Sequence, residues 1–270
     1  MSDNAAQFVG DIPIHYDQGL GPVIFEDFAR DIARRAAEIN ASRVLELAAG
    51  TGILSRKLRN VLASDVELIV TDLNEPMLEI ARSKFRDDEM AEFTPADAMQ
   101  LDFPNNHFDL IVCQFGVMFF PDKVGAFREA LRVLRPGGTY LFNVWKSMDD
   151  NPFSNIAFDI TAEFFSDNPP TFYRVPFSYP DPDVVVADIK AAGFENIEFD
   201  PVDIQTPVNS WESFARGIVF GNPLIGEILA RENTDPEEVM RSFEARCRGI
   251  WGDEPTSMPI KATVFSGKSM

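Results

Sequence analysis

The stretch VLELAAGTG, residues 44–52, joins a short apolar run that contains one acid to a loop of small residues. A buried carboxylate such as that of Glu46 costs free energy unless a partner satisfies it. The small residues from Ala48 to Gly52 let another group approach the backbone closely, either a neighbouring helix or a ligand. A loop of this kind that leads into a helix presents its N–H groups outward. The stretch therefore predicts an α/β fold whose first strand ends at a ligand site.

The composition limits the classes of partner. The chain has 270 residues and 45% hydrophobic content, which is enough for a full core. Its 43 acidic residues against 24 Lys and Arg give a net charge of −19, which repels phosphate backbones and anionic lipids. We therefore expect neither nucleic acid nor a membrane as a partner.

The cysteines and the amino terminus bear on the compartment. The two cysteines, Cys113 and Cys247, are too few for a disulfide framework. The first residues show no leader pattern, and no apolar run reaches the roughly 18 residues of a membrane span. These features predict a cytoplasmic protein.

Strand-like and helix-like segments alternate through the first half of the chain. The predicted strands are near-continuous apolar runs at 43–47, 66–72, 91–97, 108–116 and 139–145. The predicted helices are amphipathic and cover 22–39, 53–62, 75–85 and 125–134. Apolar strands separated by helices predict a mainly parallel sheet that is covered on both faces.

The pattern loosens after Trp145 and returns in two later segments. We predict one domain over 1–270, with two insertions that cover the substrate. The core is expected at 40–146, 181–202 and 259–267, and the insertions at 147–180 and 203–258.

Two further acids follow the next two strands. Asp72 ends the second predicted strand, 20 residues after Gly52, where a carboxylate can accept hydrogen bonds from ribose hydroxyls. Asp97 ends the third, where an acid can accept from an exocyclic amine. Helix capping is the alternative role for Asp72, for Asn74 and for Asp97. With Glu46, three acids end three successive strands, which capping alone does not explain.

Four motifs together resemble one family. VLELAAGTG, VTDLNEPML, PADAMQLDFPNNHFDLIVCQFGVMFF and LRPGGTYLF are similar in order and spacing to class I S-adenosylmethionine-dependent methyltransferases, in particular the small-molecule group that includes ubiquinone-biosynthesis methyltransferases. The resemblance covers roughly residues 40–146. It implies a Rossmann-like α/β fold with a seven-stranded mainly parallel sheet in the order 3-2-1-4-5-7-6, the last strand antiparallel, with helices on both faces and helical insertions.

The resemblance also implies an activity and a cofactor. The activity is methyl transfer from S-adenosylmethionine to a small organic acceptor by in-line displacement. The implied cofactor-binding residues are Tyr16, Glu46, Ala48, Gly50, Gly52, Asp72, Leu73, Met77, Asp97, Ala98 and Gln114. Glu46 is expected to orient the methionine amino end, Asp72 to hold the ribose hydroxyls, and Asp97 to accept from the adenine amine.

The remaining implied contacts complete this cofactor site. Leu73 and Met77 are expected against the adenine, with the N–H of Ala98 nearby. Gln114 is expected to border the sulfonium and the acceptor. Tyr16 occupies the place where related enzymes close a flap, and an ordinary loop aromatic is the alternative.

One residue departs from the family pattern. The family often has glycine at position 48, and here it is alanine. We expect the methyl group of Ala48 to be accommodated by a negative φ.

No catalytic residue is assigned, because alignment of the acceptor with the methyl group can supply most of the rate. If the acceptor is an amine or a hydroxyl, His15 and Tyr16 are the candidate bases. Gln114 stands where magnesium-dependent relatives carry an acid. With two histidines and two separated cysteines, the sequence also has no transition-metal ligand pattern, so we expect no metal.

Two alternatives remain open. A nicotinamide dehydrogenase is suggested by the spacing of Gly50, Gly52 and Asp72, although Ser55 replaces the third glycine of that fingerprint. A non-catalytic S-adenosylmethionine-binding module is the other. Many of the 24 phenylalanines fall in the insertions and suit an apolar or aromatic acceptor. A homodimer is left open.

Overall fold

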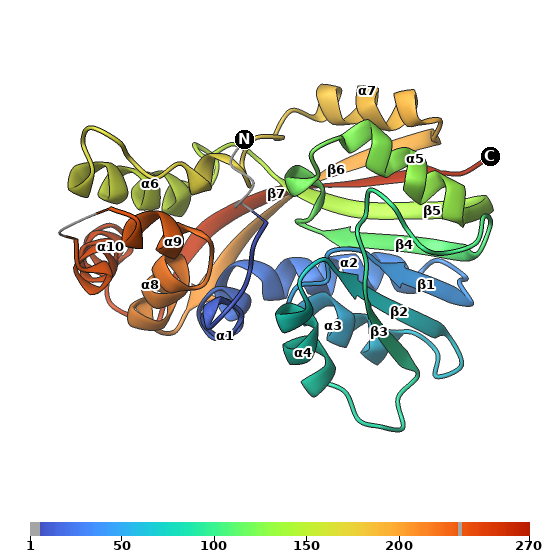
Figure 1. Ribbon diagram of the computed structural model, residues 1–270, viewed down its shortest axis with the longest axis horizontal. Helices are drawn as coiled ribbons and strands as arrows, with labels where there is room; N and C mark the ends of the chain where they lie inside the picture. Colours follow the sequence, from blue (N-terminus) through green and yellow to red (C-terminus); the bar gives the residue numbers. More distant parts are fainter. Residues whose placement is uncertain (1–5, 232–233) are drawn as a thin grey trace.

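The computed structural model describes residues 6–231 and 234–270, and its centre is one seven-stranded sheet (Figure 1). The strands are β1 (Arg43–Glu46), β2 (Glu67–Asp72), β3 (Ala91–Pro95), β4 (Phe108–Gln114), β5 (Leu134–Trp145), β6 (Glu195–Val208) and β7 (Thr256–Lys268). They lie in the order β3-β2-β1-β4-β5-β7-β6. The first five run parallel, and β7 is antiparallel to both β5 and β6. The predicted α/β fold and strand order are confirmed.

Helical segments cover both faces of this sheet. They are α1 (Ile12–His15), the π-helix η1 (Tyr16–Phe25), α2 (Glu26–Ala37), α3 (Ile53–Val61), α4 (Glu75–Ser83), the 3-10 turn η2 (Val117–Phe119), α5 (Lys123–Val133), α6 (Pro152–Phe164), the 3-10 turn η3 (Phe172–Arg174), α7 (Pro182–Ala192), α8 (Trp211–Phe220), α9 (Leu224–Leu229) and α10 (Pro236–Trp251). Alternate side chains of β5 contact opposite layers, since Phe142 packs on Phe127 of α5 and Trp145 packs on Phe28 of α2. The strands between these layers are apolar because both of their faces are buried.

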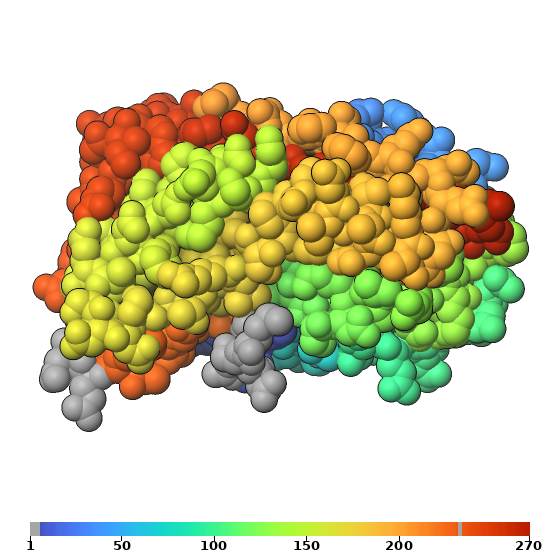
Figure 2. All heavy atoms as spheres, turned by 90° about the horizontal axis from the view of Figure 1, so that it is seen from above, coloured from blue at the N-terminus to red at the C-terminus, as the bar shows by residue number. Residues whose placement is uncertain are grey.

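The later segments form a second helical group at one end of the sheet. In Figure 1, α6, α8, α9 and α10 lie together where the long strands β6 and β7 extend beyond the other strands. Seen from above, the segment that carries α6 continues into the surface formed by α7 and α5 (Figure 2). The buried side chains of this group and of the sheet form one continuous hydrophobic cluster.

The amino-terminal helix starts earlier than predicted. The helical run begins at Ile12 rather than at Pro22, and η1 has π geometry in which the backbone N–H of Glu26 donates to the carbonyl of Gly21. Pro22 lies inside this run and has no N–H to donate. The alternative that Tyr16 is an ordinary loop aromatic is therefore wrong, because the residue lies in η1.

Tertiary packing explains the π-helix better than local propensity does. A Cβ atom on Gly19 would lie 2.5 Å from the carbonyl oxygen of Ser213 and 2.7 Å from the Cα of Gly217 in α8. The backbones of η1 and α8 are therefore in direct contact at Gly19 and Gly217, where no side chain separates them. No helix of the described residues is long and apolar enough to cross a membrane.

Candidate active site

The loop after β1 turns through three left-handed residues. Ala48, Gly50 and Gly52 have φ angles of 51°, 58° and 77°. The expectation of a negative φ at Ala48 is wrong, and a side chain in this region costs about 1–2 kcal/mol relative to a right-handed conformation. The methyl group of Ala48 fits because Gly116 leaves it space. A Cβ on Gly116 would lie 2.6 Å from the Cβ of Ala48.

Gly52 is required for helix packing as well as for its left-handed backbone. A Cβ at this position would lie 2.7 Å from the Cβ of Ala81 in α4. Gly50 is different, because its nearest neighbour is the ring of Tyr16, 4.0 Å from the place where a Cβ would stand. Of the two glycines, Gly50 is the one that faces the interior of the site.

Glu46 ends β1 with its carboxylate in the core. The residue is 1% exposed, and its Oε2 atom has no hydrogen-bond partner. The hydroxyls of Thr51 and Ser55 are also buried and unpartnered. Burial raises the pKa of Glu46 to about 8, and the negative charge of Asp72 adds to this shift. Unpartnered buried polar atoms are rare in folded proteins, so this group fits a polar ligand.

Asp72 ends β2 and ties the loop to the sheet. Its Oδ2 accepts from the N–H of Gly50 at 2.8 Å, and its Oδ1 accepts from the N–H and the side-chain amide of Asn74 at 2.8 and 3.2 Å. Burial raises the pKa of Asp72, while the hydrogen bonds from the Asn74 and Gly50 backbones oppose the shift. Asn74 does not cap α4 with its side chain. It binds the amino-terminal segment instead, through the N–H of Phe8 and the carbonyl of Ala6.

The other residues predicted to contact the adenine follow β2 and β3. Leu73 is 59% exposed, whereas Met77 and Ala98 are buried. Asp97 is exposed, and its Oδ1 accepts from the N–H of Met99 at 2.9 Å, which closes a tight turn and caps no helix. Because Asp72 pairs with Pro95 in the parallel register, these residues share the carboxyl edge of the sheet with Glu46.

Tyr16 lies over the loop. Its ring stacks on Phe25 with centroids 4.9 Å apart and meets the edge of Phe8 at 5.8 Å. Burial raises the pKa of Tyr16 far above its usual value, and the charges of Asp72 and Asp17 add to this. Asp17 forms an ion pair with Lys84 at the end of α4, which ties η1 to α4.

Gln114 ends β4 beside a residue that the sequence analysis missed. Its Nε2 donates to the carbonyl of Phe25 at 3.4 Å, and its Oε1 has no partner. The adjacent residue on β5 is Asn143, which is fully buried, accepts from the N–H of Phe115 at 2.9 Å and has an unpartnered Nδ2. An asparagine inside the apolar run TYLFNVW was the available signal for it.

An aromatic cavity of about 60 Å³ lies beside Tyr16. Ten of its fourteen lining residues are aromatic, and none of the described lining residues carries a charged side chain. Two of them, Phe115 and Trp145, stack with centroids 3.8 Å apart and an angle of 7° between their planes. The volume is about twice that of one liquid water, so an aromatic acceptor requires the walls to move apart.

The insertions complete this cavity. Besides the core residues, its lining includes Phe153, Phe172, Tyr173, Pro176, Phe177 and Asn222. His15, one of the two candidate bases, does not line it and packs on Phe220 with centroids 5.6 Å apart. Tyr16, the other candidate, does line it.

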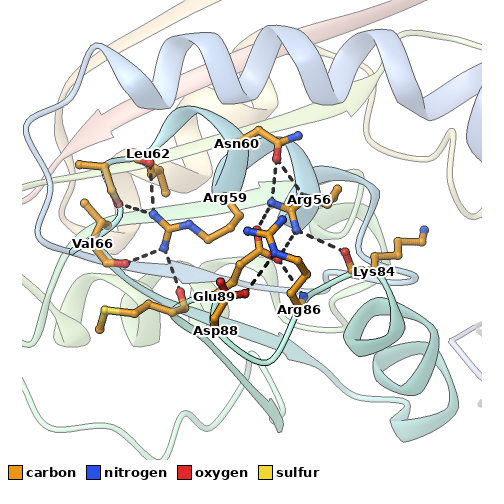
Figure 3. Close-up of polar contacts among 11 residues, drawn as sticks. Arg56, Arg59, Asn60, Leu62, Val66, Lys84, Arg86, Asp88 and Glu89 are labelled. Carbon is orange, nitrogen blue, oxygen red and sulfur yellow. Dashed lines mark hydrogen bonds and ion pairs between the residues drawn. The ribbon is translucent and has the colours of Figure 1, made fainter.

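Arginines brace the opposite end of the sheet (Figure 3). Arg59 is 7% exposed and donates to the carbonyls of Val66 and Met90 at 2.8 and 2.9 Å, and also to those of Leu62 and Ala63. Burial lowers its pKa. Arg56 binds Glu89 through two hydrogen bonds of 2.7 and 2.8 Å. These contacts connect α3 to the loops that precede β2 and β3, and so position the strands that end in the predicted adenosine contacts.

Comparisons with known proteins identify the family. A family profile described as a methyltransferase domain matches residues 45–142. The ubiquinone/menaquinone biosynthesis C-methyltransferase UbiE of Ectopseudomonas mendocina is 31% identical over 172 residues, covering 58% of this chain and 67% of that protein. The chain belongs to the class I S-adenosylmethionine-dependent methyltransferases. The UbiE protein of Pseudomonas entomophila is 30% identical to this methyltransferase over 174 residues, covering 59% of the chain and 68% of the relative.

Solved structures of other proteins share the methyltransferase fold. The YcgJ protein of Bacillus subtilis has a TM-score of 0.59 and 20% identity, covering 90% of this chain and 98% of its own. Phosphoethanolamine N-methyltransferase 2 of Haemonchus contortus, in complex with S-adenosylhomocysteine, has a TM-score of 0.60 and 15% identity, covering 97% of this chain and 59% of its own.

The methyltransferase is thus an enzyme whose methyl donor is S-adenosylmethionine. The dehydrogenase and the non-catalytic module find no support among these relatives. Within the described residues, no group of three or more His, Cys, Asp or Glu side chains is arranged to hold a metal ion.

Proposed function

We propose that this methyltransferase methylates a small, neutral, aromatic acceptor that binds in the aromatic cavity. The observation that carries this proposal is the cavity lining, which is aromatic and free of charged side chains among the described residues. A charged acceptor would lose its hydration there without gaining an ionic partner. Because the UbiE relatives are named as C-methyltransferases, we propose a ring carbon as the position that receives the methyl group.

We further propose that the cofactor lies along the carboxyl edge of β1, β2 and β3. The unpartnered Oε2 of Glu46 suits the ammonium group of the methionine moiety. The oxygens of Asp72 accept three hydrogen bonds between them. A carboxylate has about four lone-pair sites, so Asp72 can still accept from ribose.

The remaining predicted contacts complete the proposed cofactor site. Backbone at Ala48, Gly50 and Gly52 would flank the methionine portion, and Gln114 would border the acceptor side, with Tyr16 as the cover. At the adenine end we place Leu73, Met77, Asp97 and Ala98.

The chain's own residues supply alignment and exclusion of water. When bound, the cofactor supplies a methyl group on a cationic sulfur. Tyr16 and Phe25 cover the loop, and Phe115 and Trp145, which stack on each other, line the cavity with apolar ring surface. Because burial raises the pKa of both cavity tyrosines, Tyr16 and Tyr173 remain protonated near neutral pH. We therefore assign the enzyme the task of holding and desolvating the acceptor.

We also propose that the chain folds as one domain whose insertions cover the acceptor. The cavity supports this, because its wall combines Trp145 of β5 with Phe153 of α6 and Asn222 of the segment before α9. Neither the core nor the insertions enclose the cavity alone.

The proposal is tested by measuring turnover with a panel of acceptors. The purified enzyme and S-adenosylmethionine are incubated with phenols and naphthols, and separately with small aliphatic amines and carboxylates. Release of S-adenosylhomocysteine and a carbon-methylated product, detected by mass spectrometry, is expected only with the aromatic acceptors. Turnover of the charged aliphatic acceptors, with none of the aromatic ones, would refute the proposal.

A further inference from the structure

Ser55 is a buried polar residue of α3 without a role so far. It is fully buried, and its hydroxyl has no hydrogen-bond partner among the described residues. A serine inside a helix usually faces solvent or donates to the carbonyl four residues earlier, and Ser55 does neither. Its Oγ lies 3.5 Å from the point where a Cβ on Gly52 would stand, so the hydroxyl lies against the loop that follows β1.

The hydroxyl of Ser55 is also close to the carboxyl of Glu46. Burial raises the pKa of Glu46, the nearby Ser55 hydroxyl opposes this rise, and the charge of Asp72 adds to it. Oε2 of Glu46 is buried and unpartnered, as the Ser55 hydroxyl is. The two groups are complementary, because Ser55 can donate a hydrogen bond and the Glu46 carboxyl can accept one.

A hydroxyl at this position stabilises one form of the carboxyl more than the other. An ionised carboxylate only accepts hydrogen bonds, whereas a neutral carboxyl also carries a donor of its own. A hydrogen bond to a charged group is stronger than one between two neutral groups. The Ser55 hydroxyl therefore favours the ionised form of Glu46.

We propose that Ser55 is a positioning residue that holds Glu46 ionised against the ammonium group of the bound cofactor. This inference rests on the proposed contact between Glu46 and that ammonium group. On binding, the neutral carboxyl of Glu46 gives its proton to the solvent. The carboxylate then accepts hydrogen bonds from both the ammonium group and Ser55. Ser55 acts through Glu46 and is assigned no contact with the transferred methyl group.

The other titratable groups around this carboxyl do not favour its ionisation. Asp72 of β2 is an acid whose negative charge raises the pKa of Glu46. Cys113 of β4 senses the charge of Glu46, and burial raises the pKa of its thiol to about 12, so the thiol stays neutral. Tyr16 of η1 covers the loop, and burial raises its pKa as well. The hydroxyl that opposes the cost of ionising Glu46 is that of Ser55.

The test measures binding of S-adenosylhomocysteine between pH 6 and pH 8.5 to the unmodified enzyme and to Ser55→Ala. Loss of one hydrogen bond to the carboxylate should raise by about one pH unit the pH at which binding levels off. The variant should therefore bind about tenfold more weakly at pH 7 and only about threefold more weakly at pH 8.5. At pH 8, calorimetry should count release of about half a proton by the unmodified enzyme and close to one by the variant.

The melting temperature is a second readout, which a purely structural role of Ser55 would lower. Alanine is the better helix former, and Ser55→Ala removes a buried hydroxyl that has no partner among the described residues. The melting temperature without ligand should therefore stay the same or rise. The matched control is Ser154→Ala in α6, which removes a fully buried serine hydroxyl that donates to the carbonyl of Asn151 at 2.8 Å. The control should lower the melting temperature and keep the pH dependence of binding.

The outcomes separate this inference from the proposed function. If Ser55→Ala changes the affinity by the same factor at every pH, or not at all, Ser55 does not act on the ionisation of Glu46 and the inference is overturned, while the ammonium contact stands. A large fall in melting temperature with unchanged proton release also overturns it, because the hydroxyl is then structural. If binding to the unmodified enzyme does not depend on pH, the proposed ammonium contact of Glu46 is wrong, and the inference fails with it.

Discussion

Replacing Glu46 with glutamine tests the proposed ammonium contact. The pKa of Glu46 is raised from 4.5 to about 8, so the free enzyme keeps a proton at pH 7 that the ammonium-bound form must lose. Only about a tenth of the molecules then have an ionised Glu46. We therefore expect affinity for S-adenosylhomocysteine to rise about tenfold per pH unit from pH 6 towards pH 8, with release of close to one proton at pH 7.

The same shift predicts an effect on stability. The folded protein holds this proton up to about pH 8, whereas the unfolded chain loses it near pH 4.5. The free energy of unfolding therefore falls as pH rises between these values. A difference of roughly 3.5 units corresponds to about 5 kcal/mol. Glu46→Gln lacks this term, so the free variant should be more stable than the unmodified enzyme at pH 8 and similar to it at pH 4.

Calorimetry in buffers with different ionisation enthalpies counts the released proton, and denaturant titration at pH 4 and pH 8 measures the stability. Glu67→Gln is the control, because this half-buried acid pairs with Arg43 at the opposite end of β1 and β2 from Glu46 and Asp72. It should leave affinity and proton release unchanged. Binding of S-adenosylhomocysteine that is independent of pH, or that keeps its pH dependence in Glu46→Gln, would refute the assignment. Asp72, whose pKa is also raised, would then be the group to examine.

Three further changes test the packing that positions the site. Gly116→Ala should lower the free energy of unfolding by about 1–3 kcal/mol, because the added methyl group would collide with that of Ala48. The double variant with Ala48→Gly should recover part of that loss. If the effects of the two substitutions on stability simply add, the contact between the two positions is contradicted. Arg59→Met should destabilise by about 2–4 kcal/mol in urea titration, since it removes a guanidinium that donates to four carbonyls, of which that of Val66 is buried and the others are partly buried. A loss below about 0.5 kcal/mol would show that water replaces the guanidinium. Gly19→Ala should push η1 away from Gly217 and so lower both the melting temperature and the affinity for S-adenosylhomocysteine. If both stay unchanged, the contact between Gly19 and Gly217 is not tight.

Much of the sheet was predictable because its signals are local. Each core strand is a near-continuous apolar run, and its helix follows with an amphipathic pattern. Even the ends were close, with β2 at Glu67–Asp72 against a prediction of 66–72. The π-helix was not predictable from the sequence, because Pro22 indicated the start of a helix and not its interior. The contact that stabilises the π-helix comes from Gly217, almost two hundred residues away in the sequence.

The conformation of Ala48 shows a second limit of local reasoning. A methyl group at a left-handed position is disfavoured on its own, so a negative φ was the natural expectation. The space that allows it belongs to Gly116, on the loop after another strand. The position of Asn143 beside Gln114 has the same origin, because strand register brings the two together. The individual cofactor contacts stay predictions until binding is measured.

The sequence by itself determined the class of fold, the methyltransferase family and the acids at the strand ends, because these depend on short-range patterns and motif spacing. Only the tertiary structure decided what encloses the acceptor. The cavity joins Tyr16 of the amino-terminal helix, Trp145 of β5, and Tyr173 and Asn222 of the insertions. Side chains this far apart in the chain meet only because burying their apolar surface drives the insertions onto the carboxyl end of the sheet.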